Sequence, residues 1–304
     1  MSDSSSSTRE QPIDLSAVNV VSTAWLDAHL GAPDLRVLDT TVVLDIDTWQ
    51  ANTGRDDWLR AHIPGAGFID HIEELSDAAA NARLASGVRA YALPSAEQFA
   101  AAVGAHGIGP DTNVVTYDTR GGMWAARLWW LLRLFGHERV AVLDGGFALW
   151  AAEQRPLESG ATAAPVAQTF KPAFRSALLA TQDEVLTVAE GGDGVLIHAL
   201  SPAMFSGEER AALPRAGRIP GSVNVPFYEI YQQDGRLKSA SELRDIFAAV
   251  GVDQRGVRTI TYCGGGIAAS SDALALAQIG VEAAVYDGSL VEWSANTSLP
   301  LQTG

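Results

Sequence analysis

The sequence predicts an α/β protein built from two tandem domains, each with a mainly parallel β-sheet flanked by helices. Short apolar runs typical of buried strands alternate with longer helical runs. This alternation favours parallel pairing, because parallel strands need a long connection between them. The same order of elements occurs twice, at a period far longer than the repeats of solenoid proteins. A length of 304 residues and a hydrophobic content of 47% suffice for two domains with buried cores.

Each half is predicted to contain a strand, a glycine loop, a helix and a second strand, in that order. The corresponding segments are 114–118, 121–122, 123–135 and 140–144 in the first half, and 259–263, 264–266, 267–280 and 284–287 in the second. Upstream, each half has an earlier strand and then an Ile-Pro-Gly motif followed by a short strand. These segments are 35–38, 63–65 and 66–69 in the first half, and 195–197, 219–221 and 223–225 in the second. The chain is therefore interpreted as a duplicated domain.

Two helices between these strands are predicted to begin at serine caps. Ser95 precedes an apolar run to Val103, and the run over 239–250 has Ser241 as its expected cap. A serine hydroxyl in this position accepts a hydrogen bond from a free N–H group of the first turn. Tryptophans at helical spacing are expected in the hydrophobic core: Trp129, Trp130 and Trp150.

Composition sets the expected domain boundaries. Residues 1–15 are polar and serine-rich, and we predict a disordered tail and not a signal peptide, because no apolar segment follows a basic start. Residues 16–155, which lack the cysteine, are assigned to the first domain and residues 176–304, which carry it, to the second. Residues 156–175, where Pro, Gly, Ser and Thr accumulate, are assigned to a linker.

Charge and cysteine content restrict the partners and the compartment. The formal net charge of −15 argues against nucleic acid or an anionic membrane as a partner, since both would repel this chain. No uncharged apolar run reaches the roughly 18 residues of a membrane-spanning helix. A single cysteine cannot form an intramolecular disulfide and stays reduced most readily in the cytosol. We therefore expect a cytoplasmic protein.

The single cysteine, Cys263, stands between a predicted strand and a predicted helix and is followed by three glycines. Glycines let the loop curl, and the start of the helix presents N–H groups to whatever the sulfur carries. The loop is therefore predicted to cradle an anionic sulfur, to lower the pKa of the thiol and to make Cys263 a nucleophile. The alternative is a buried cysteine with a packing role alone. The first half has Asp118 at the equivalent position, so we expect one working site.

The motifs around this loop resemble those of the two-domain rhodaneses, the thiosulfate and 3-mercaptopyruvate sulfurtransferases. They are Tyr-Cys-Gly-x-Gly at 262–266, the two Ile-Pro-Gly motifs, and Tyr-Asp-Gly-Ser followed by Glu-Trp at 286–293, and the resemblance extends from about Ser16 to Gly304. It implies that Cys263 takes sulfur from a small anionic donor and holds it as a persulfide. The sulfur then passes to cyanide or to a thiol such as thioredoxin or a low-molecular-weight thiol. No metal or organic cofactor is implied.

The resemblance also indicates groups that bind the sulfur and the donor. Arg215 matches an arginine position that the family uses for the donor carboxylate, and Arg218, in place of the usual histidine, is expected to add further donors. His62 is a candidate auxiliary group, with a turn-stabilising hydrogen bond as the alternative. The residues expected around the persulfide, whose N–H groups donate to it, are Gly264, Gly265, Gly266, Ile267 and Ala268, followed by Ala269.

The loop Cys-Gly-Gly-Gly-Ile-Ala carries no basic residue, and it therefore resembles the loop of mercaptopyruvate users more than that of thiosulfate users. It departs from the family pattern at Gly265 and Ala268, where serine and threonine are usual, and at 204–207, where an Arg-Phe-Arg-Gly-like stretch is usual. These departures keep open a non-catalytic sulfur carrier or interaction protein. A cysteine phosphatase is disfavoured, because it needs an arginine at the far end of the loop, where this chain has Ala269 and Ser270.

Overall fold

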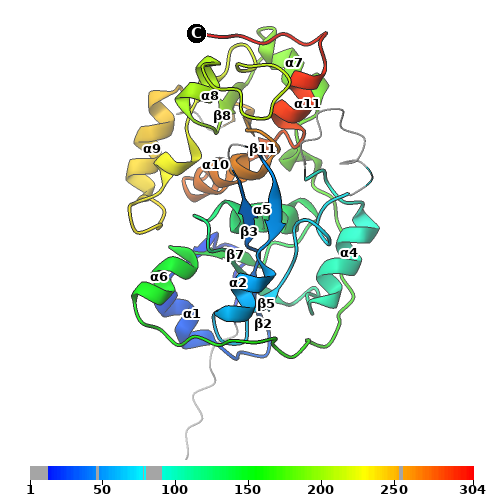
Figure 1. Ribbon diagram of the computed structural model, residues 1–304, viewed down its shortest axis with the longest axis vertical. Coiled ribbons are helices and arrows are strands. Elements are labelled where there is room, and N and C mark those ends of the chain that lie inside the picture. The colour runs from blue at the N-terminus through cyan, green and yellow to red at the C-terminus, as the bar shows by residue number, and fades with distance from the viewer. Residues whose placement is uncertain (1–12, 46–47, 78, 80–90, 253–255) are drawn as a thin grey trace, which may run out of the picture.

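The two halves of the chain lie one above the other along the long axis of the molecule, the first half in the lower part of Figure 1 and the second in the upper part. The computed structural model describes residues 13–45, 48–77, 79, 91–252 and 256–304. Between the halves, the helices α5 (Met123–Leu134) and α10 (Ile267–Gln278) pack against each other. Among the described residues, no helix has both the length and the apolar character needed to cross a membrane.

The first half contains a five-stranded sheet in which every neighbouring pair of strands is parallel. The strands lie in the order β1, β7, β6, β2 and β5. A short antiparallel ribbon, β3 (Val42–Leu44) with β4 (Ala51–Thr53), reaches from this half toward the second (Figure 1). The sheet and its helices are β1 (Val20–Val21), α1 (Thr23–His29), β2 (Leu35–Asp39), α2 (Arg55–Arg60), β5 (Gly67–Phe68), α4 (Ala96–Ala105), β6 (Asn113–Tyr117), β7 (Val140–Leu143) and α6 (Gly146–Ala152).

The second half contains a four-stranded sheet, also parallel throughout, in the order β11, β10, β8 and β9. An isolated parallel bridge from Leu179 to Val285 extends it beside β11, so the two sheets match strand for strand. The predicted α/β fold with tandem, mainly parallel sheets is confirmed. The elements are η1 (Ser176–Leu178), α7 (Gln182–Ala189), β8 (Val195–His198), α8 (Pro202–Ser206), β9 (Val223–Asn224), η2 (Phe227–Ile230), α9 (Ala240–Ala249), β10 (Thr259–Tyr262), β11 (Ala283–Val285) and α11 (Ser289–Ala295).

Side-chain contacts repeat together with the strands. The hydroxyl of the tyrosine that ends the central strand accepts a hydrogen bond from the isoleucine N–H of the Ile-Pro-Gly motif in both halves. The same tyrosine follows a threonine that donates to the next helix, and a later tryptophan indole donates to a proline carbonyl. The pairs are Tyr117 with Ile63 and Tyr262 with Ile219, Thr116 with Ala125 and Thr261 with Ala269, and Trp150 with Pro156 and Trp293 with Pro300. The duplication is thus preserved in local packing.

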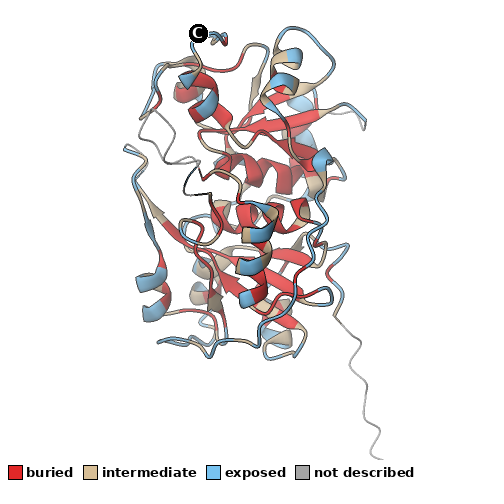
Figure 2. Ribbon diagram, turned by 90° about the vertical axis from the view of Figure 1, so that its right-hand side faces the viewer, coloured by how far each residue is buried: buried red, intermediate tan, exposed pale blue. Residues whose placement is uncertain are grey.

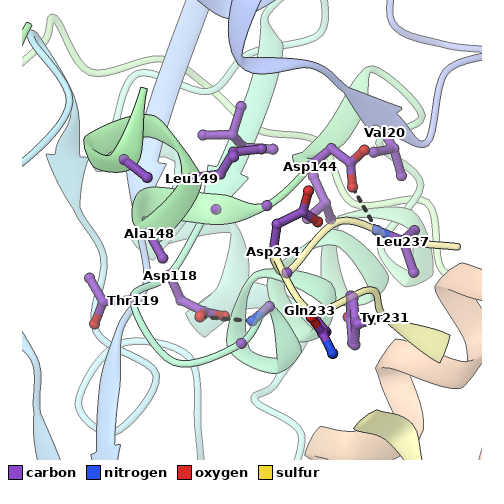
Figure 3. Close-up of a pocket in the computed structure, with 18 of the residues that line it drawn as sticks. Val20, Asp118, Thr119, Asp144, Ala148, Leu149, Tyr231, Gln233, Asp234 and Leu237 are labelled. Atoms are coloured by element: carbon purple, nitrogen blue, oxygen red, sulfur yellow. Dashed lines mark hydrogen bonds between the residues drawn. The ribbon is translucent and has the colours of Figure 1, made fainter. Parts of the chain in front are cut away.

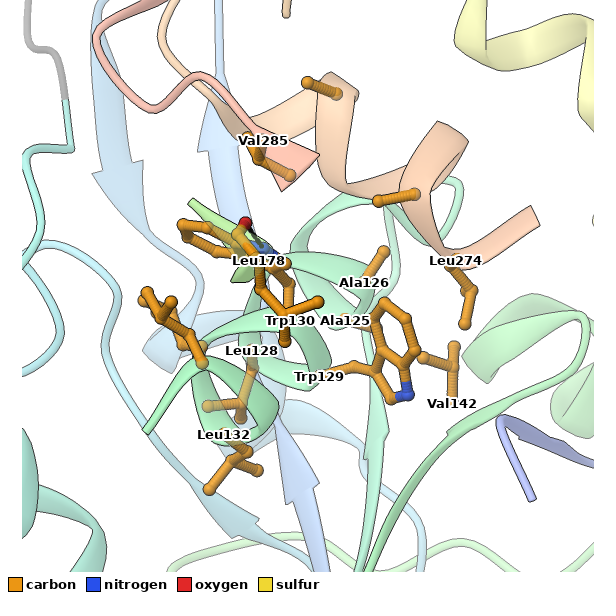
Figure 4. Packing of buried hydrophobic residues seen from close by; sticks show 14 of the residues in the cluster. Ala125, Ala126, Leu128, Trp129, Trp130, Leu132, Val142, Leu178, Leu274 and Val285 are labelled. Carbon is orange, nitrogen blue, oxygen red and sulfur yellow. Dashed lines mark hydrogen bonds between the residues drawn. The ribbon is translucent and has the colours of Figure 1, made fainter. Parts of the chain in front are cut away.

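The predicted core tryptophans, Trp129, Trp130 and Trp150, are each 2% exposed or less. Trp130 donates its Nε1–H to the carbonyl oxygen of Leu178, 3.1 Å away, and so joins the two halves (Figure 4). Buried residues continue through α5 and α10 from one sheet to the other (Figure 2). The interface between the halves is therefore part of the hydrophobic core.

The segment 156–175, predicted to be a linker, contains no helix or strand and is held along the first half. The N–H of Gln168 donates to the carbonyl oxygen of Gly104 at 2.9 Å, and the N–H of Ala173 donates to that of Phe135 at 2.8 Å. Phe170 is buried in the core. These contacts attach the segment to the surface of the first domain along much of its length.

Two sequence predictions need correction. Residues 1–12 of the predicted tail lie outside the described residues, but Leu15 does not belong to a tail. It is 2% exposed, and its N–H donates to Asn113 Oδ1 at 3.0 Å. The cap of α9 is Ser239 and not Ser241. Ser239 and Glu242 form a reciprocal capping box, which satisfies two N–H groups at once, whereas Ser95 caps α4 as predicted.

Candidate active site

The loop after β10 brings the sulfur of Cys263 to the start of α10. Gly266 caps this helix at φ +79°, a left-handed conformation that favours glycine. A Cβ at Gly266 would also lie 2.9 Å from the main-chain oxygen of Asp287. The loop therefore turns tightly at this glycine and folds back over Cys263, which is 2% exposed.

Burial raises the pKa of the Cys263 thiol above its ordinary value, because the charged form loses contact with water. Main-chain hydrogen bonds to the sulfur oppose this effect and lower the pKa in part. Four of the six predicted N–H donors are present at the thiol, and Gly264 and Ile267 are not among them. The predicted lowering of the thiol pKa is wrong, because burial outweighs these donors. The donors are the N–H groups of Ala269, Gly265, Gly266 and Ala268.

Ser289 holds both ends of this loop. Its Oγ accepts hydrogen bonds from the N–H groups of Cys263 and Gly266, each at 3.1 Å, and donates to the carbonyl oxygen of Tyr286 at 2.7 Å. Ser289 is fully buried and has a φ of +47°, in the region where side chains are strained. Sequence reasoning quoted this serine within a motif but gave it no role, since only the folded chain brings it to the loop.

Arg127 ties the same loop to the first half. Its guanidinium, on α5, lies 2.5 Å from Asp287 Oδ1 and donates to the carbonyl oxygen of Gly266 at 3.4 Å. The Arg127 side chain is 1% exposed and stacks on the ring of Trp130. Burial raises the pKa of Asp287, and Arg127 lowers it in part. A buried ion pair between the halves therefore supports the loop that carries Cys263.

A cavity of about 620 Å³ lies beside Cys263 and is lined by both halves of the chain. Trp49 covers the loop, since a Cβ at Gly264 would collide with its indole ring. The charged residues among the described lining are Glu209 and Arg210. First-half residues in the lining are Leu44, Trp49, Tyr91, Met123 and Trp124, and second-half residues include Leu200, Met204, Phe227, Tyr228, Gly264, Gly265, Ile267 and Ala268.

The equivalent loop of the first half carries Asp118, and its carboxylate occupies the ring of N–H groups. A separate cavity of about 350 Å³ lies beside this loop, lined also by the second-half residues Tyr231 and Asp234 (Figure 3). The carboxylate accepts four main-chain hydrogen bonds of 2.6–3.0 Å from Arg120, Gly122, Trp124 and Ala125. This loop therefore binds its own anion and offers no nucleophilic sulfur.

Both halves of the sequence match one family. The family model of the rhodanese-like domain matches residues 22–153 and again residues 181–296. The chain belongs to the rhodanese family. The two matched segments fall within the two predicted domains, and the interval between them contains the predicted linker.

This rhodanese is similar along most of its length to named sulfurtransferases. It is 34% identical to the 3-mercaptopyruvate sulfurtransferase of Escherichia coli strain K12, with 91% of this chain and 95% of that protein covered. It is 37% identical to the thiosulfate sulfurtransferase of Bos taurus, with 90% and 91% covered. The crystal structure of SseA from Escherichia coli, a 3-mercaptopyruvate sulfotransferase, matches with a TM-score of 0.76 at 33% identity, covering 89% of this chain and 98% of that one. This rhodanese is a sulfurtransferase.

The two arginines expected to hold the donor do not line the cavity of this rhodanese. The Arg218 guanidinium donates to the carbonyl oxygens of Phe205 and Gly304 and lies 4.3 Å from the Phe205 ring centroid. Both arginines hold the loops around α8 and α11 in place. Their N–H groups donate to main-chain oxygens there and are therefore not free to bind the donor. The carbonyl partners of Arg215 are those of Ser294, Leu299, Trp293 and Asn296 at 2.7–3.1 Å.

In the part of the chain that the structure describes, Arg210 is the arginine that lines the cavity. Its side chain is exposed and donates one hydrogen bond, to the carbonyl oxygen of Pro214 at 3.2 Å. Sequence reasoning missed it, although it stands in the same arginine-containing stretch as Arg215 and Arg218. The turn between Gly207 and Arg218 decides which arginine lines the cavity, and that turn has no periodic sequence signal.

Two histidines of this rhodanese, His62 and His198, are buried. His62 is fully buried, stacks on Trp58, and has its Nδ1 2.8 Å from the Trp58 carbonyl oxygen. It lies outside the Cys263 cavity, as the turn-stabilising alternative requires. Burial lowers the pKa of His198 to about 3, so that its ring is neutral. Within the described part of the chain, no three His, Cys, Asp or Glu side chains gather as a metal site.

Proposed function

We propose that this sulfurtransferase uses Cys263 as its nucleophile and takes sulfur from 3-mercaptopyruvate in preference to thiosulfate. The observation that carries the first part is the position of the thiol, beside a cavity and within a ring of N–H donors. Such fixed dipoles stabilise charge on the outer sulfur of a persulfide without reorganising during the reaction. By their names, the relatives act on 3-mercaptopyruvate or on thiosulfate.

In the proposed first step, Cys263 Sγ attacks the sulfur of 3-mercaptopyruvate. A sulfur–sulfur bond forms, the C–S bond of the donor breaks, and its electron pair stays on the carbon that becomes the methyl group of pyruvate. That carbon takes the proton of the Cys263 thiol, and the proton of the donor thiol remains on the outer sulfur. The products are pyruvate and the Cys263 persulfide, and no other reactant is needed.

The protonation state of Cys263 supports this choice of donor. Because burial raises the pKa of the thiol, its proton is available at neutral pH to the carbon of the leaving pyruvate. Thiosulfate instead releases sulfite, which leaves with its electron pair and needs no proton. Attack on either donor uses the thiolate of Cys263, but only the 3-mercaptopyruvate reaction also uses the proton that the raised pKa keeps at the site.

The charges at the cavity favour the same donor. Among the described lining residues, the one guanidinium is that of Arg210, and it suits one carboxylate. Thiosulfate holds both of its negative charges on one small ion, so Glu209 beside Arg210 repels it more strongly than a ligand whose charges lie apart. We propose Arg210 as the contact for the donor carboxylate, in the place first expected for Arg215 and Arg218.

In the proposed second step, the persulfide passes its outer sulfur to a thiol such as thioredoxin or a low-molecular-weight thiol. The cytoplasm is the proposed compartment, because a lone free cysteine stays reduced there. A net charge of −15 argues against an acidic membrane surface or nucleic acid as a partner.

The test is the intact mass of the reduced protein after brief exposure to 3-mercaptopyruvate or to thiosulfate, with pyruvate and sulfite assayed in parallel. We expect a gain of one sulfur atom with catalytic release of pyruvate, and no gain in the Cys263→Ala variant. A faster gain with release of sulfite would reverse the donor preference. No gain from either donor would overturn the proposal and leave the sulfur carrier as the better account.

A further inference from the structure

The Cys263 cavity is much larger than the donor that we propose for it. Its volume of about 620 Å³ falls within the range of about 300–1,000 Å³ that is typical of sites for drug-sized ligands. 3-Mercaptopyruvate is far smaller than such ligands. The same cavity must also admit the acceptor, because Cys263 is 2% exposed and the persulfide sulfur lies beside it. The volume that the donor leaves unfilled is therefore available to the acceptor and indicates its size.

Aromatic rings from both halves line this volume. Tyr91 and Trp124 of the first half meet edge to face, with ring centroids 5.0 Å apart, and Phe227 and Tyr228 of the second half do so at 5.7 Å. Tyr228 is 49% exposed. Tyr91 and Trp124 are buried behind the surface of the cavity, while the exposed ring of Tyr228 can stack on a flat apolar ligand. Such aromatic pairs gain stability beyond the area they bury.

Trp49 lies nearest to the reacting loop. Its indole ring covers the main chain at Gly264, where a Cβ would collide with the ring. Trp49 has a φ of +55° and is only half-buried, so its backbone is strained while part of the residue remains exposed. Such strain persists where the surroundings fix it, and it occurs often at ligand sites. Trp49 is thus placed to contact a molecule that approaches the persulfide.

The lining also limits the charge and the acidity of the acceptor. Arg210 offers exposed N–H donors that suit a carboxylate once the donor has left. Among the described lining residues, Glu209 is the one carboxylate and none is a histidine, so the cavity offers little base to deprotonate a thiol. An aromatic thiol ionises more readily than an alkyl thiol and enters as the thiolate.

From these observations we propose that the sulfur acceptor is a low-molecular-weight aromatic thiol that carries a carboxylate, and that Trp49 selects for its ring. The inference rests on the proposed function of Cys263. It identifies the acceptor as a small molecule. A protein thiol is then expected to be a poorer acceptor than the aromatic thiol.

The transfer step needs no further reactant. The aryl thiolate attacks the outer sulfur of the protonated Cys263 persulfide, a new sulfur–sulfur bond forms to the acceptor, and the old one breaks. Its electron pair returns to Cys263 Sγ. The persulfide proton then moves to this sulfur, whose pKa burial raises, and the aryl persulfide leaves as an anion.

The experiment compares three acceptors with the persulfide form of the enzyme, prepared with 3-mercaptopyruvate. They are 4-mercaptobenzoate, thiophenol without the carboxylate and mercaptoacetate without the ring. With rates referred to the thiolate concentration, we expect kcat/KM for 4-mercaptobenzoate to exceed that for mercaptoacetate by about tenfold or more. Equal values, or a higher value for reduced thioredoxin than for 4-mercaptobenzoate, would overturn the inference.

Variants test the role of Trp49. In Trp49→Ala we expect the ratio of kcat/KM for thiophenol over mercaptoacetate to fall by about fivefold. The matched control is Trp25→Ala, which removes another half-buried tryptophan of the first half, outside the cavity, and it should keep the wild-type ratio. An unchanged ratio in Trp49→Ala would remove Trp49 from the selection of the acceptor.

A second measurement avoids reliance on the folding of any variant. Benzoate has the ring and the carboxylate but no thiol, so it should slow the alkylation of wild-type Cys263 by iodoacetamide more than acetate does at the same concentration. Equal protection by the two would count against an aromatic site. If no persulfide forms from 3-mercaptopyruvate, the proposed function fails. If the persulfide forms and the aromatic thiol has no advantage, only the present inference fails.

Discussion

The two glycine loops of this rhodanese have the same scaffold and opposite contents. When α5 and α10 are aligned at their first residues, Met123 and Ile267, three N–H donors to the Asp118 carboxylate correspond to three N–H donors to the Cys263 thiol. The first loop fills this ring of donors with a charge of its own. In the second loop, the ring of N–H donors is available to the group that the sulfur carries. The comparison indicates that the ring is a general anion site.

The two halves also differ in the turn that follows the next strand, β7 in the first half and β11 in the second. Ser289 of the second half corresponds to Gly146 of the first, and both have a positive φ, +47° and +55°. Glycine adopts this conformation without strain, whereas serine does not. Ser289 is nevertheless retained where its hydroxyl holds Cys263 and Gly266. At this turn, therefore, only the half that carries the sulfur accepts backbone strain.

Giving the second loop the acid of the first makes the comparison directly testable. Cys263→Asp should reduce pyruvate release from 3-mercaptopyruvate by at least about a thousandfold, because the nucleophile is gone. The ring of N–H groups can donate to the new carboxylate, so the protein should still fold. Activity and thermal unfolding are measured beside Cys263→Ala. Turnover within tenfold of the wild type would show that the sulfur of Cys263 is not the nucleophile.

The link between the loops is tested at the buried ion pair. Arg127→Ala should lower the free energy of unfolding by about 3–5 kcal/mol, because Asp287 is left buried without its partner. Urea unfolding measures the loss. The control is Arg60→Ala, which removes a side chain that is 75% exposed and should cost less than about 1 kcal/mol. Equal costs for the two variants would mean that the pair does not join the halves.

Emptying the first loop should affect stability and not chemistry. Asp118→Ala leaves N–H donors without their acceptor, and we expect a loss of about 2–3 kcal/mol in the free energy of unfolding. The rate of persulfide formation at Cys263 should stay within about twofold of the wild type, below the unfolding temperature. A large loss of rate, with little loss of stability, would give the first loop a direct part in the reaction.

Exchanging Ser289 and Gly146 between the two halves distinguishes the effect of backbone strain on stability from the effect of the serine hydroxyl on the reaction. In Ser289→Gly, relief of strain should offset lost hydrogen bonds, so that the free energy of unfolding changes by less than about 1 kcal/mol. The rate of persulfide formation should still fall about tenfold, because the loop loses its brace. Gly146→Ser should instead destabilise by about 1–3 kcal/mol, since a Cβ there lies 2.9 Å from the Asp118 carbonyl oxygen. Stopped-flow donor consumption and urea unfolding give the two quantities.

The smallest effect concerns pH. Because burial raises the pKa of the Cys263 thiol, the thiolate fraction grows with pH beyond the ordinary cysteine pKa of about 8.5. The rate of persulfide formation from thiosulfate should therefore still rise at about pH 9. A rate that is already constant above about pH 7 would instead support the lowered pKa that the sequence predicts for the Cys263 thiol.

The repeated pattern of strands and glycine loops was predictable, because it depends on local periodicity and on residues that are neighbours in sequence. The ring of N–H donors around Cys263 followed from the same local pattern. The pKa of the thiol did not, since it depends on how deeply the rest of the fold buries the sulfur. Arg210 was missed because the turn after Gly207 has no regular spacing. Trp49 reaches the site from the other half of the chain, which no local pattern indicates.

The shared wall of the cavity has an evolutionary consequence. Trp49, Tyr91 and Trp124 belong to the first half, while the reacting sulfur belongs to the second. Mutation or recombination in the first half of the gene can therefore change what the enzyme recognises while the codon for Cys263 and its loop stay untouched. The cavity-lining residues of the first half can vary in this way without replacing the nucleophile, whereas Arg127 and Asp118 of the same half are constrained by the contacts they make.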